Sequence, residues 1–187
     1  MFRIFLLTTL ISTTSFTLAY EQAFEPTAPG VIELKELPAG RLLEATSDGS
    51  YFTESNQLFR PLFNYIQQHD IAMTTPVEAR PNPGAMYFWV SKDQVEKAKA
   101  STANVKVIDV PKRLIVAMGG RGSYSQENFL ETEAKLMQWL TENPKFEKVG
   151  DSFAVYWNGP FTPWFMKRYE VQVEVRLSTE GTDLVSR

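Results

Sequence analysis

Between positions 168 and 176 the chain alternates strictly between apolar and polar residues. One set is apolar and consists of Tyr169, Val171, Val173 and Val175. The other set is polar and consists of Glu170, Gln172 and Glu174. Successive side chains of a strand point to opposite faces, so this segment predicts a β-strand with one apolar face. Shorter apolar runs predict further strands at 31–37, 41–45, 71–79, 85–91, 105–110, 113–118 and 152–157.

Two other segments have the spacing of amphipathic helices. The first begins after Thr53 and has an apolar stripe of Leu58, Phe59, Leu62, Phe63 and Ile66. The second begins after Ser125 and has a stripe of Phe129, Leu130, Ala134, Leu136, Met137 and Leu140. Thr53 and Ser125 are the expected N-caps, because their hydroxyls can accept from first-turn N–H groups. Pro61 predicts a kink or local distortion within the first helix.

The sequence at the start of the first helix nearly recurs before the second. Gly-Ser-Tyr followed by polar residues ending in Asn occupies 49–56 and again 122–128. Each copy is interpreted as a strand–turn–helix junction, so an internal duplication is predicted, with halves at about 31–91 and 105–177. We expect an α+β domain in which two pseudo-symmetric strand–strand–helix–strand–strand halves form a distorted antiparallel β-barrel. Two main helices would pack on its sheet.

Residues 1–19 have the pattern of a cleavable signal peptide. Arg3 supplies the positive charge, residues 4–18 are apolar but diluted by Thr and Ser, and Ala19 is a small residue at the expected cut. A membrane-spanning helix would need about 20 strongly apolar residues. We therefore expect a periplasmic or secreted protein without a stable membrane anchor. It would consist of an N-terminal arm at 20–30, one domain at 31–177 and a flexible tail at 178–187.

Composition excludes several kinds of site. The 187 residues include no Cys, which excludes thiolate nucleophiles and Cys-ligated zinc. His69 is the single His, so a zinc site with several His ligands is excluded and a Ser-His-Asp triad would have to use this residue. The formal net charge of −3 gives no general attraction for nucleic acid. The glycines at 119–122 lack the Lys of a phosphate-binding loop, and we predict no nucleic-acid partner.

Four stretches resemble the SOUL haem-binding protein family. They are FRPLFNYI, IAMTTPV, AMYFWVS and PFTPWFMKRYEVQVEV, within a similarity that runs from about Val31 to Arg176. The resemblance implies a distorted barrel made of two similar halves. It also implies non-covalent binding of haem b or another tetrapyrrole through an apolar surface near the first helix. The leading hypothesis is therefore a non-enzymatic binder, and an enzyme is the alternative.

This resemblance suggests a cofactor-binding set of Phe59, Arg60, Leu62, Phe63, Ile66, His69 and Met73. His69 is the possible axial ligand to haem iron, since a neutral imidazole nitrogen suits that role. Arg60, Arg80 and Lys167 or Arg168 are possible partners of the propionates. The alternatives remain open: His69 as a surface loop residue, Met73 and the apolar stripe as protein core, and the cations as solvated charges.

A related fold suggests a different function. The gyrase-inhibitor-like effector-binding domains hold small molecules in a groove between two halves, so the ligand could be another apolar small molecule. A hydrolytic version would use Glu170 or Glu174 as general acid or base, which requires a buried carboxylate in a concave site. On the other interpretation, both carboxylates lie on a solvated strand face.

The last motif is an aromatic loop around Pro160 and Pro163. Its aromatic residues are Tyr156, Trp157, Phe161, Trp164 and Phe165. Such a loop can be a ligand lid, a partner surface or a packed connection. We favour the packed connection, because proline turns position aromatic rings at a low entropy cost.

Overall fold

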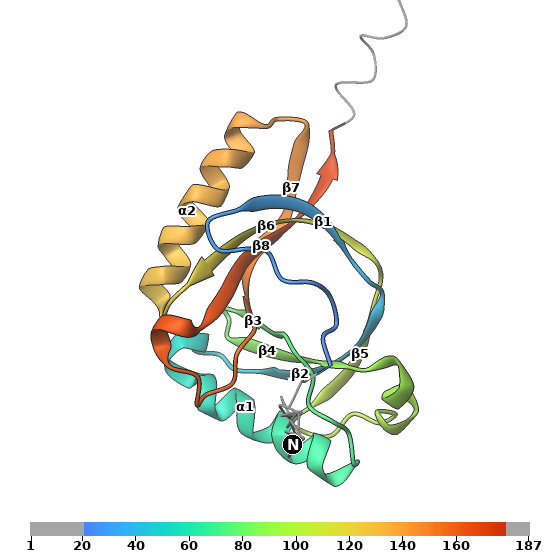
Figure 1. The fold of residues 1–187 in the computed structure, drawn as a ribbon. Helices are drawn as coiled ribbons and strands as arrows, with labels where there is room; N and C mark the ends of the chain where they lie inside the picture. Colours follow the sequence, from blue (N-terminus) through green and yellow to red (C-terminus); the bar gives the residue numbers. More distant parts are fainter. Residues whose placement is uncertain (1–20, 179–187) are drawn as a thin grey trace, which may run out of the picture.

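The predicted strands assemble into one antiparallel sheet of eight strands that carries two α-helices on one face (Figure 1). The computed structural model describes residues 21–178, so the predicted signal peptide at 1–19 and nearly all of the predicted tail lie outside the described residues. The strands are β1 (Ile32–Leu37), β2 (Gly40–Thr46), β3 (Val77–Arg80), β4 (Ala85–Val90), β5 (Lys106–Val110), β6 (Arg113–Arg121), β7 (Phe146–Tyr156) and β8 (Arg168–Leu177). The helices are α1 (Tyr51–Gln68), α2 (Gln126–Glu142) and the short 3₁₀ helices η1 (Lys92–Lys97) and η2 (Trp164–Met166). Among these described helices, none is long and apolar enough to cross a membrane.

The two halves interlock through the pairing of their strands. The order across the sheet is β1-β6-β8-β7-β3-β4-β2-β5, so the first strand of each half pairs with the second strand of the other. If each strand is replaced by its counterpart in the other half (β1 by β5, β2 by β6, β3 by β7 and β4 by β8, and the reverse), the same order is read from the opposite edge of the sheet. The sheet curves strongly (Figure 1), but its edge strands β1 and β5 do not pair with each other, so the predicted barrel closure is not observed. That the halves arose by duplication stays a prediction.

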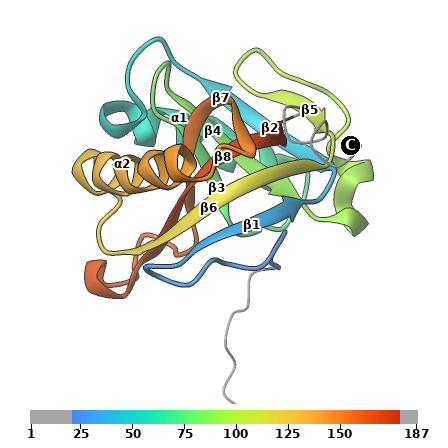
Figure 2. The same ribbon diagram turned by 90° about the horizontal axis from the view of Figure 1, so that it is seen from above.

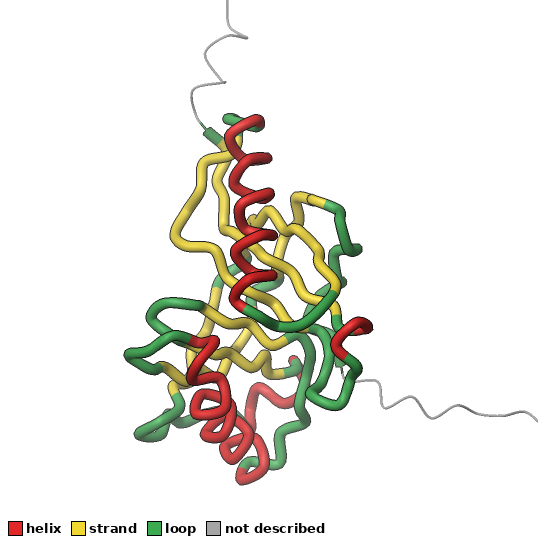
Figure 3. Tube along the Cα trace, turned by 90° about the vertical axis from the view of Figure 1, so that its left-hand side faces the viewer, coloured by secondary structure: helices red, strands yellow, loops and turns green. Residues whose placement is uncertain are grey.

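Both α-helices lie on the outer face of the curved sheet (Figure 3). α1 contacts β2 and β4, whereas α2 contacts β6, β7 and β8. Their buried stripes form the main core with the sheet, and they include Leu58, Leu62, Ile66, Phe129, Leu136 and Leu140. Burying an aliphatic side chain contributes roughly 1.5–3 kcal/mol, so this layer accounts for much of the stability of each half.

The helix boundaries and stripes differ from the predictions in two places, the start of α1 and the apolar stripe of α2. Ser125 is confirmed as the N-cap of α2, since its hydroxyl accepts from Asn128 N–H at 3.2 Å. α1 instead begins before Thr53 and is capped by Ser50. Leu130 is 51% exposed and Ala134 is also exposed, because they lie outside the narrow face of α2 that meets the sheet. α1 continues through Pro61 without a break.

The strand predicted at 71–79 forms only over Val77–Arg80. Pro76 has no N–H group to donate to a neighbouring strand. Thr75 bonds to the N-terminal segment instead: its N–H donates to the Glu21 carbonyl at 2.9 Å, and its carbonyl accepts from Ala23 N–H at 2.8 Å. The preceding residues therefore form an irregular connection from α1 to β3.

Residues 21–31, hereafter the arm, cross the inner face of the curved sheet (Figures 1 and 2). This face carries two small apolar clusters that include Trp89 and Trp157, separate from the core under the helices. The polar face of β8, which carries Glu170 and Gln172, also points to the inner face of the sheet. Glu170 and Gln172 are both 0% exposed. The interpretation that places both carboxylates on a solvated face is therefore wrong for Glu170, because the arm and the curvature of the sheet enclose it.

The tyrosines of the two Gly-Ser-Tyr copies meet at one ring. Tyr51 stacks on Tyr156 with 5.7 Å between ring centroids, and Tyr124 lies on Tyr156 at 4.2 Å. Burial raises the pKa of Tyr51, raises that of Tyr124 to about 12, and raises that of Tyr156 well above its usual value. The two junctions thus converge on a buried tyrosine cluster between the helices and the sheet.

This tyrosine cluster predicts a loss of stability at alkaline pH. Tyrosines ionise near pH 10 in the unfolded chain but at higher pH in the folded protein, so stability is complete below pH 10 and falls as pH rises toward about 12. Burial also raises the pKa of Tyr87 to about 12, so titration of absorbance at 295 nm should show that at least four of the seven tyrosines are still protonated at pH 11, and denaturant should release them. Ionisation of all seven near pH 10 in folded protein would contradict this account.

Candidate functional site

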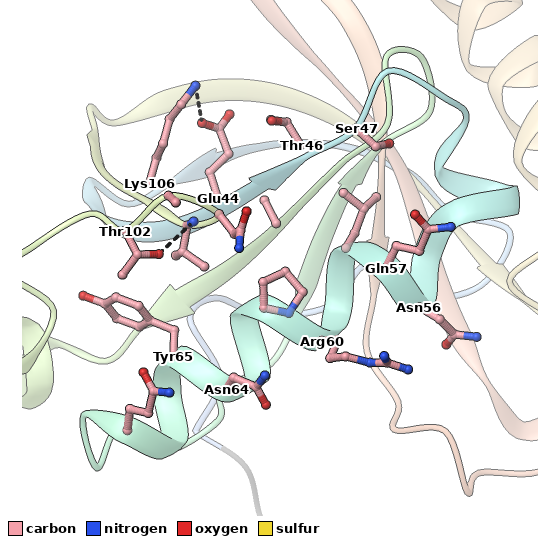
Figure 4. Close-up of a pocket in the computed structure, with 17 residues that line it drawn as sticks. Glu44, Thr46, Ser47, Asn56, Gln57, Arg60, Asn64, Tyr65, Thr102 and Lys106 are labelled. Carbon is pink, nitrogen blue, oxygen red and sulfur yellow. Dashed lines mark hydrogen bonds and ion pairs between the residues drawn. The ribbon is translucent and has the colours of Figure 1, made fainter.

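An open cavity of about 720 Å³ lies between α1, β2 and the segment that precedes β5 (Figure 4). β5 pairs with β2 only over Gly40–Glu44, so the last residues of β2 have no strand neighbour on that side. α1 and residues 102–106 form the other walls. The lining residues are Glu44, Ala45, Thr46, Ser47, Asn56, Gln57, Leu58, Arg60, Pro61, Asn64, Tyr65, Gln68, Thr102, Ala103, Asn104, Val105 and Lys106.

The cavity walls combine apolar surface with positive charge. Along α1 the apolar lining residues are half-buried Pro61 and the buried residues Leu58 and Tyr65, each 2% exposed. Lys106 Nζ lies 3.7 Å from a carboxylate oxygen of Glu44, whereas Arg60 is exposed and makes no ion pair within residues 21–178. The charged lining residues therefore comprise two cations and one anion. Their balance favours a ligand that has an apolar body and at least one acidic group.

His69 extends the stripe of α1 that faces this cavity. It follows Tyr65 by one helical turn, and the two rings stack at 4.1 Å with an interplanar angle of 18°. The Nδ1 atom lies 2.9 Å from the Tyr65 carbonyl oxygen, which can only accept, so Nδ1 carries the proton and donates. In the neutral imidazole, Nε2 is then left with its lone pair available. His69 itself is half-buried and lies just beyond the lining residues.

The other residues predicted to bind a cofactor occupy different parts of α1 and its surroundings. Leu62 and Ile66 are buried at 0% and 2% exposure and face the sheet. Phe59 and Phe63 stack on each other at 5.5 Å on the helix flank opposite the cavity, where Phe59 also meets Phe88. Met73 is half-buried against the main core. The structure therefore places Arg60 in the lining of one cavity and His69 just beyond that lining, and it separates both residues from the two phenylalanines.

The other predicted propionate partners also lie away from this cavity. Arg80 stacks over Tyr87 and Phe153, which are inner-face residues. Lys167 lies over the Tyr124 ring at 4.9 Å. A cation that sequence reasoning missed is Lys97, whose Nζ pairs with Asp70 Oδ2 at 2.9 Å in the turn after α1. This hydrogen bond lowers the pKa of Asp70.

The aromatic loop is packed only in part. Tyr156 and Trp157 are buried at 5% exposure, as a packed connection requires. The tip of the loop is open, with Phe161 99%, Trp164 67% and Phe165 56% exposed. The prediction of a packed connection is wrong for these three rings, because the two prolines carry the loop away from the sheet.

The inner face holds the carboxylate that was proposed as an acid or base. Glu170 accepts from Trp157 Nε1 at 2.8 Å, Gln172 Nε2 at 2.7 Å, Lys35 Nζ at 2.8 Å and Thr27 N at 2.7 Å. Its burial meets one requirement of the hydrolytic hypothesis. Its lone pairs, however, are already taken by protein donors, and the arm covers it. Glu174 is half-buried further along β8.

The model of the SOUL heme-binding protein family matches residues 15–174, which is most of the chain. The chain belongs to this family. The match confirms the resemblance of the four sequence stretches and supports a haem-binding role for this SOUL protein. No curated protein matches it in sequence.

Solved structures share the fold at low sequence identity. The EcmrR C-terminal domain has a TM-score of 0.64 and 16% identity over 79% of this SOUL protein and 98% of that chain. EcmrR in a DNA complex has a TM-score of 0.65 and 15% identity over 79% of this chain, but the match spans only 58% of that chain. A hydrolase from Listeria innocua has a TM-score of 0.54 and 14% identity over 80% of this chain and 94% of that one. These similarities establish the fold alone.

Proposed function

We propose that this SOUL protein binds haem b or a related tetrapyrrole non-covalently in the cavity beside α1. The observation that carries the proposal is an open cavity of about 720 Å³ with apolar and cationic walls, next to the only His of the chain. Its volume lies within the roughly 300–1,000 Å³ typical of small-molecule sites. Membership of a haem-binding family makes a tetrapyrrole the first ligand to test.

The side chains fit such a ligand in three respects. Half-buried Pro61 offers apolar surface in a wall that Leu58 and Tyr65 also line at 2% exposure each, and a flat porphyrin binds largely by burying apolar surface. Arg60 and Lys106 can donate charge-assisted hydrogen bonds to its carboxylates. His69 has a fixed tautomer with Nε2 available, which is the arrangement an axial ligand requires.

Each part of the cavity has a separate role in this proposal. The α1 surface holds the ring system, the cations orient it by its acidic edge, and His69 distinguishes an iron porphyrin from an iron-free one. When bound, the haem would supply an iron centre. Leu62 and Ile66 hold α1 against the sheet and so keep the cavity wall in place. In the same proposal, residues 1–19 direct export to the periplasm or the exterior.

Replacement of His69 by Ala tests the assignment of the iron ligand. Hemin added to unchanged protein should give a saturable shift of the Soret band at one equivalent. We expect His69→Ala to change the position of this band and to weaken hemin binding by at least about tenfold, or about 1.4 kcal/mol. Gln68→Ala is the matched control, since Gln68 lines the cavity but cannot ligate iron.

Iron-free protoporphyrin separates ligation from the rest of the site. His69→Ala should bind it as well as unchanged protein does, because no axial bond is lost. Identical hemin spectra and affinities for His69→Ala and unchanged protein would exclude His69 as the ligand. Binding that never saturates in unchanged protein would count against the cavity as a tetrapyrrole site.

A further inference from the structure

The arm lies on the inner face of the sheet as an extended peptide held at two points. Near its start, the bridge Gln22↔Thr75 includes the bond from Ala23 N–H to the Thr75 carbonyl, at 2.8 Å. Near its end, the bridge Pro29↔Gly119 includes the bond from Gly30 N–H to the Gly119 carbonyl, at 2.9 Å. Both bridges are parallel and isolated. The arm is therefore bound across the face without becoming a strand of the sheet.

Phe24 is the apolar anchor of the arm. Its ring meets Trp89 edge-to-face at 5.7 Å and Trp157 edge-to-face at 5.4 Å. Lys35 Nζ lies 5.4 Å from the same ring. Trp89 belongs to β4 in the first half and Trp157 follows β7 in the second half. The pocket for this ring is thus built by both halves, and it favours an aromatic side chain.

Thr27 is the polar anchor, and it binds the buried carboxylate of Glu170. The backbone N–H of Thr27 donates to Glu170 Oε1 at 2.7 Å, and its hydroxyl, which has one proton, lies 2.6 Å from Glu33 Oε1 and 3.2 Å from Glu170 Oε2. The other donors to Glu170 come from the sheet itself: Lys35, Trp157 and Gln172. Loss of the arm would leave this buried carboxylate without part of its hydrogen bonds, so an occupant that offers the same donors is favoured.

The inner face of the sheet also accommodates the backbone of an extended peptide. A Cβ on Gly119 would lie 2.3 Å from the Ala28 carbonyl oxygen, so a glycine is needed where the arm passes. A second cavity of about 220 Å³ lies beside the arm and Trp89. Gln172 Oε1 is buried on this face and has no hydrogen-bond partner among the described residues. These features leave space and an acceptor that the arm does not use.

We propose that the inner face is a peptide-binding site that recognises an extended Phe-Xaa-Xaa-Thr segment, and that the arm is its occupant in cis. A segment of a partner protein with the same spacing binds by exchange with the arm. The arm suits exchange because it has no regular secondary structure, and most of its residues other than Phe24 and Thr27 are exposed. Gly30, with φ of 81°, joins it to β1. The site is independent of the proposed tetrapyrrole cavity, which β2 and α1 form elsewhere in the fold.

The arm is covalently tethered to the protein and competes with any free peptide for the inner face. A tethered segment has a high effective concentration, so a free peptide binds unchanged protein only weakly. Phe24→Ala in the full chain removes the anchor ring from the arm but leaves Trp89, Trp157 and Glu170 in place. A fluorescent peptide with the sequence of residues 21–31 should then bind this variant at least about tenfold more tightly than it binds unchanged protein.

Two controls define recognition of the peptide. The same peptide with Ala in place of its Phe should not bind the Phe24→Ala protein above background in fluorescence anisotropy. Phe161→Ala, which truncates a ring that is 99% exposed, should leave peptide binding as weak as in unchanged protein. Equal binding of the peptide to Phe24→Ala and unchanged protein, or equal binding of the two peptides, would overturn the proposal.

A second measurement uses unchanged protein and does not depend on how the variant folds. Excess acetylated and amidated peptide should accelerate hydrogen exchange of the arm amides, including Thr27 N–H, as the arm is displaced. The amides of β8 should keep their exchange rates. An arm whose exchange is unaffected by saturating peptide would show that the segment is a fixed part of the fold and would overturn the proposal.

Discussion

Replacement of Glu170 by Ala is expected to lower the free energy of unfolding by about 3–5 kcal/mol. The carboxylate is 0% exposed, and its ion pair with Lys35 is 2.8 Å long. Its removal would leave Lys35 Nζ, Trp157 Nε1 and Gln172 Nε2 without this shared acceptor on an enclosed face. Lys35 Nζ would keep only the carboxylate of Glu33, 3.7 Å away, so the loss of its shorter, buried partner and the unsatisfied donors are the main source of the effect. Chemical denaturation followed by tryptophan fluorescence measures it.

The control for this prediction is an exposed ion pair. Glu147→Ala breaks a bond of 2.7 Å to Arg176 at the surface, where solvent screens the charges, so stability should hardly change. Glu170→Gln keeps the shape and two acceptor lone pairs of the side chain, so its loss should lie between those of the other two variants. A loss below about 1 kcal/mol for Glu170→Ala would contradict the role assigned to this carboxylate.

Hydrophobic periodicity predicted the elements because most of them bury one apolar face. β8 and α2 lie close to their predicted positions, since alternation and helical spacing report on contacts with the sheet core. The open edges of the sheet were not predictable, because pairing of β1 with β5 depends on curvature rather than on the pattern of either strand. The duplicated junction did indicate two equivalent halves.

The inner face shows where local patterns fail. The alternation of β8 left open whether Glu170 lies in a groove or on a solvated face, and the residue that covers it is Thr27, 143 positions away in the sequence. No local pattern reports such a contact. The sequence separated an N-terminal arm at 20–30 from the domain at 31–177, yet two side chains, Phe24 and Thr27, anchor the arm on the domain.

Of the residues that line the candidate cavity, only residues of α1 were predicted from the sequence. Arg60 and His69 were named from the family resemblance, which centres on the first helix. Lys106 and the rest of the opposite wall were missed, because they come from a segment that lies outside the four similar stretches. Phe59 and Phe63 share the apolar stripe with Leu62 in sequence but lie on the other flank of the helix. A helical stripe alone does not say which of its edges faces a cavity.

Blocking the cavity should have the largest effect on ligand binding. Pro61 lines the middle of the α1 wall, so Pro61→Trp would place an indole where the ring system of the ligand is proposed to lie. We expect hemin binding to weaken by about a hundredfold or more, which corresponds to about 2.8 kcal/mol. The helix should tolerate the change, because Trp restores the backbone N–H that Pro61 lacks.

Hemin titration of Pro61→Trp beside Pro61→Ala therefore tests the tetrapyrrole cavity most directly. Both variants remove the proline, but only Trp fills the cavity, so a general effect on α1 would appear in both. The account predicts a saturable Soret shift at one equivalent for Pro61→Ala and its loss for Pro61→Trp. Equal saturable binding by the two variants would contradict it and place the haem elsewhere on the protein.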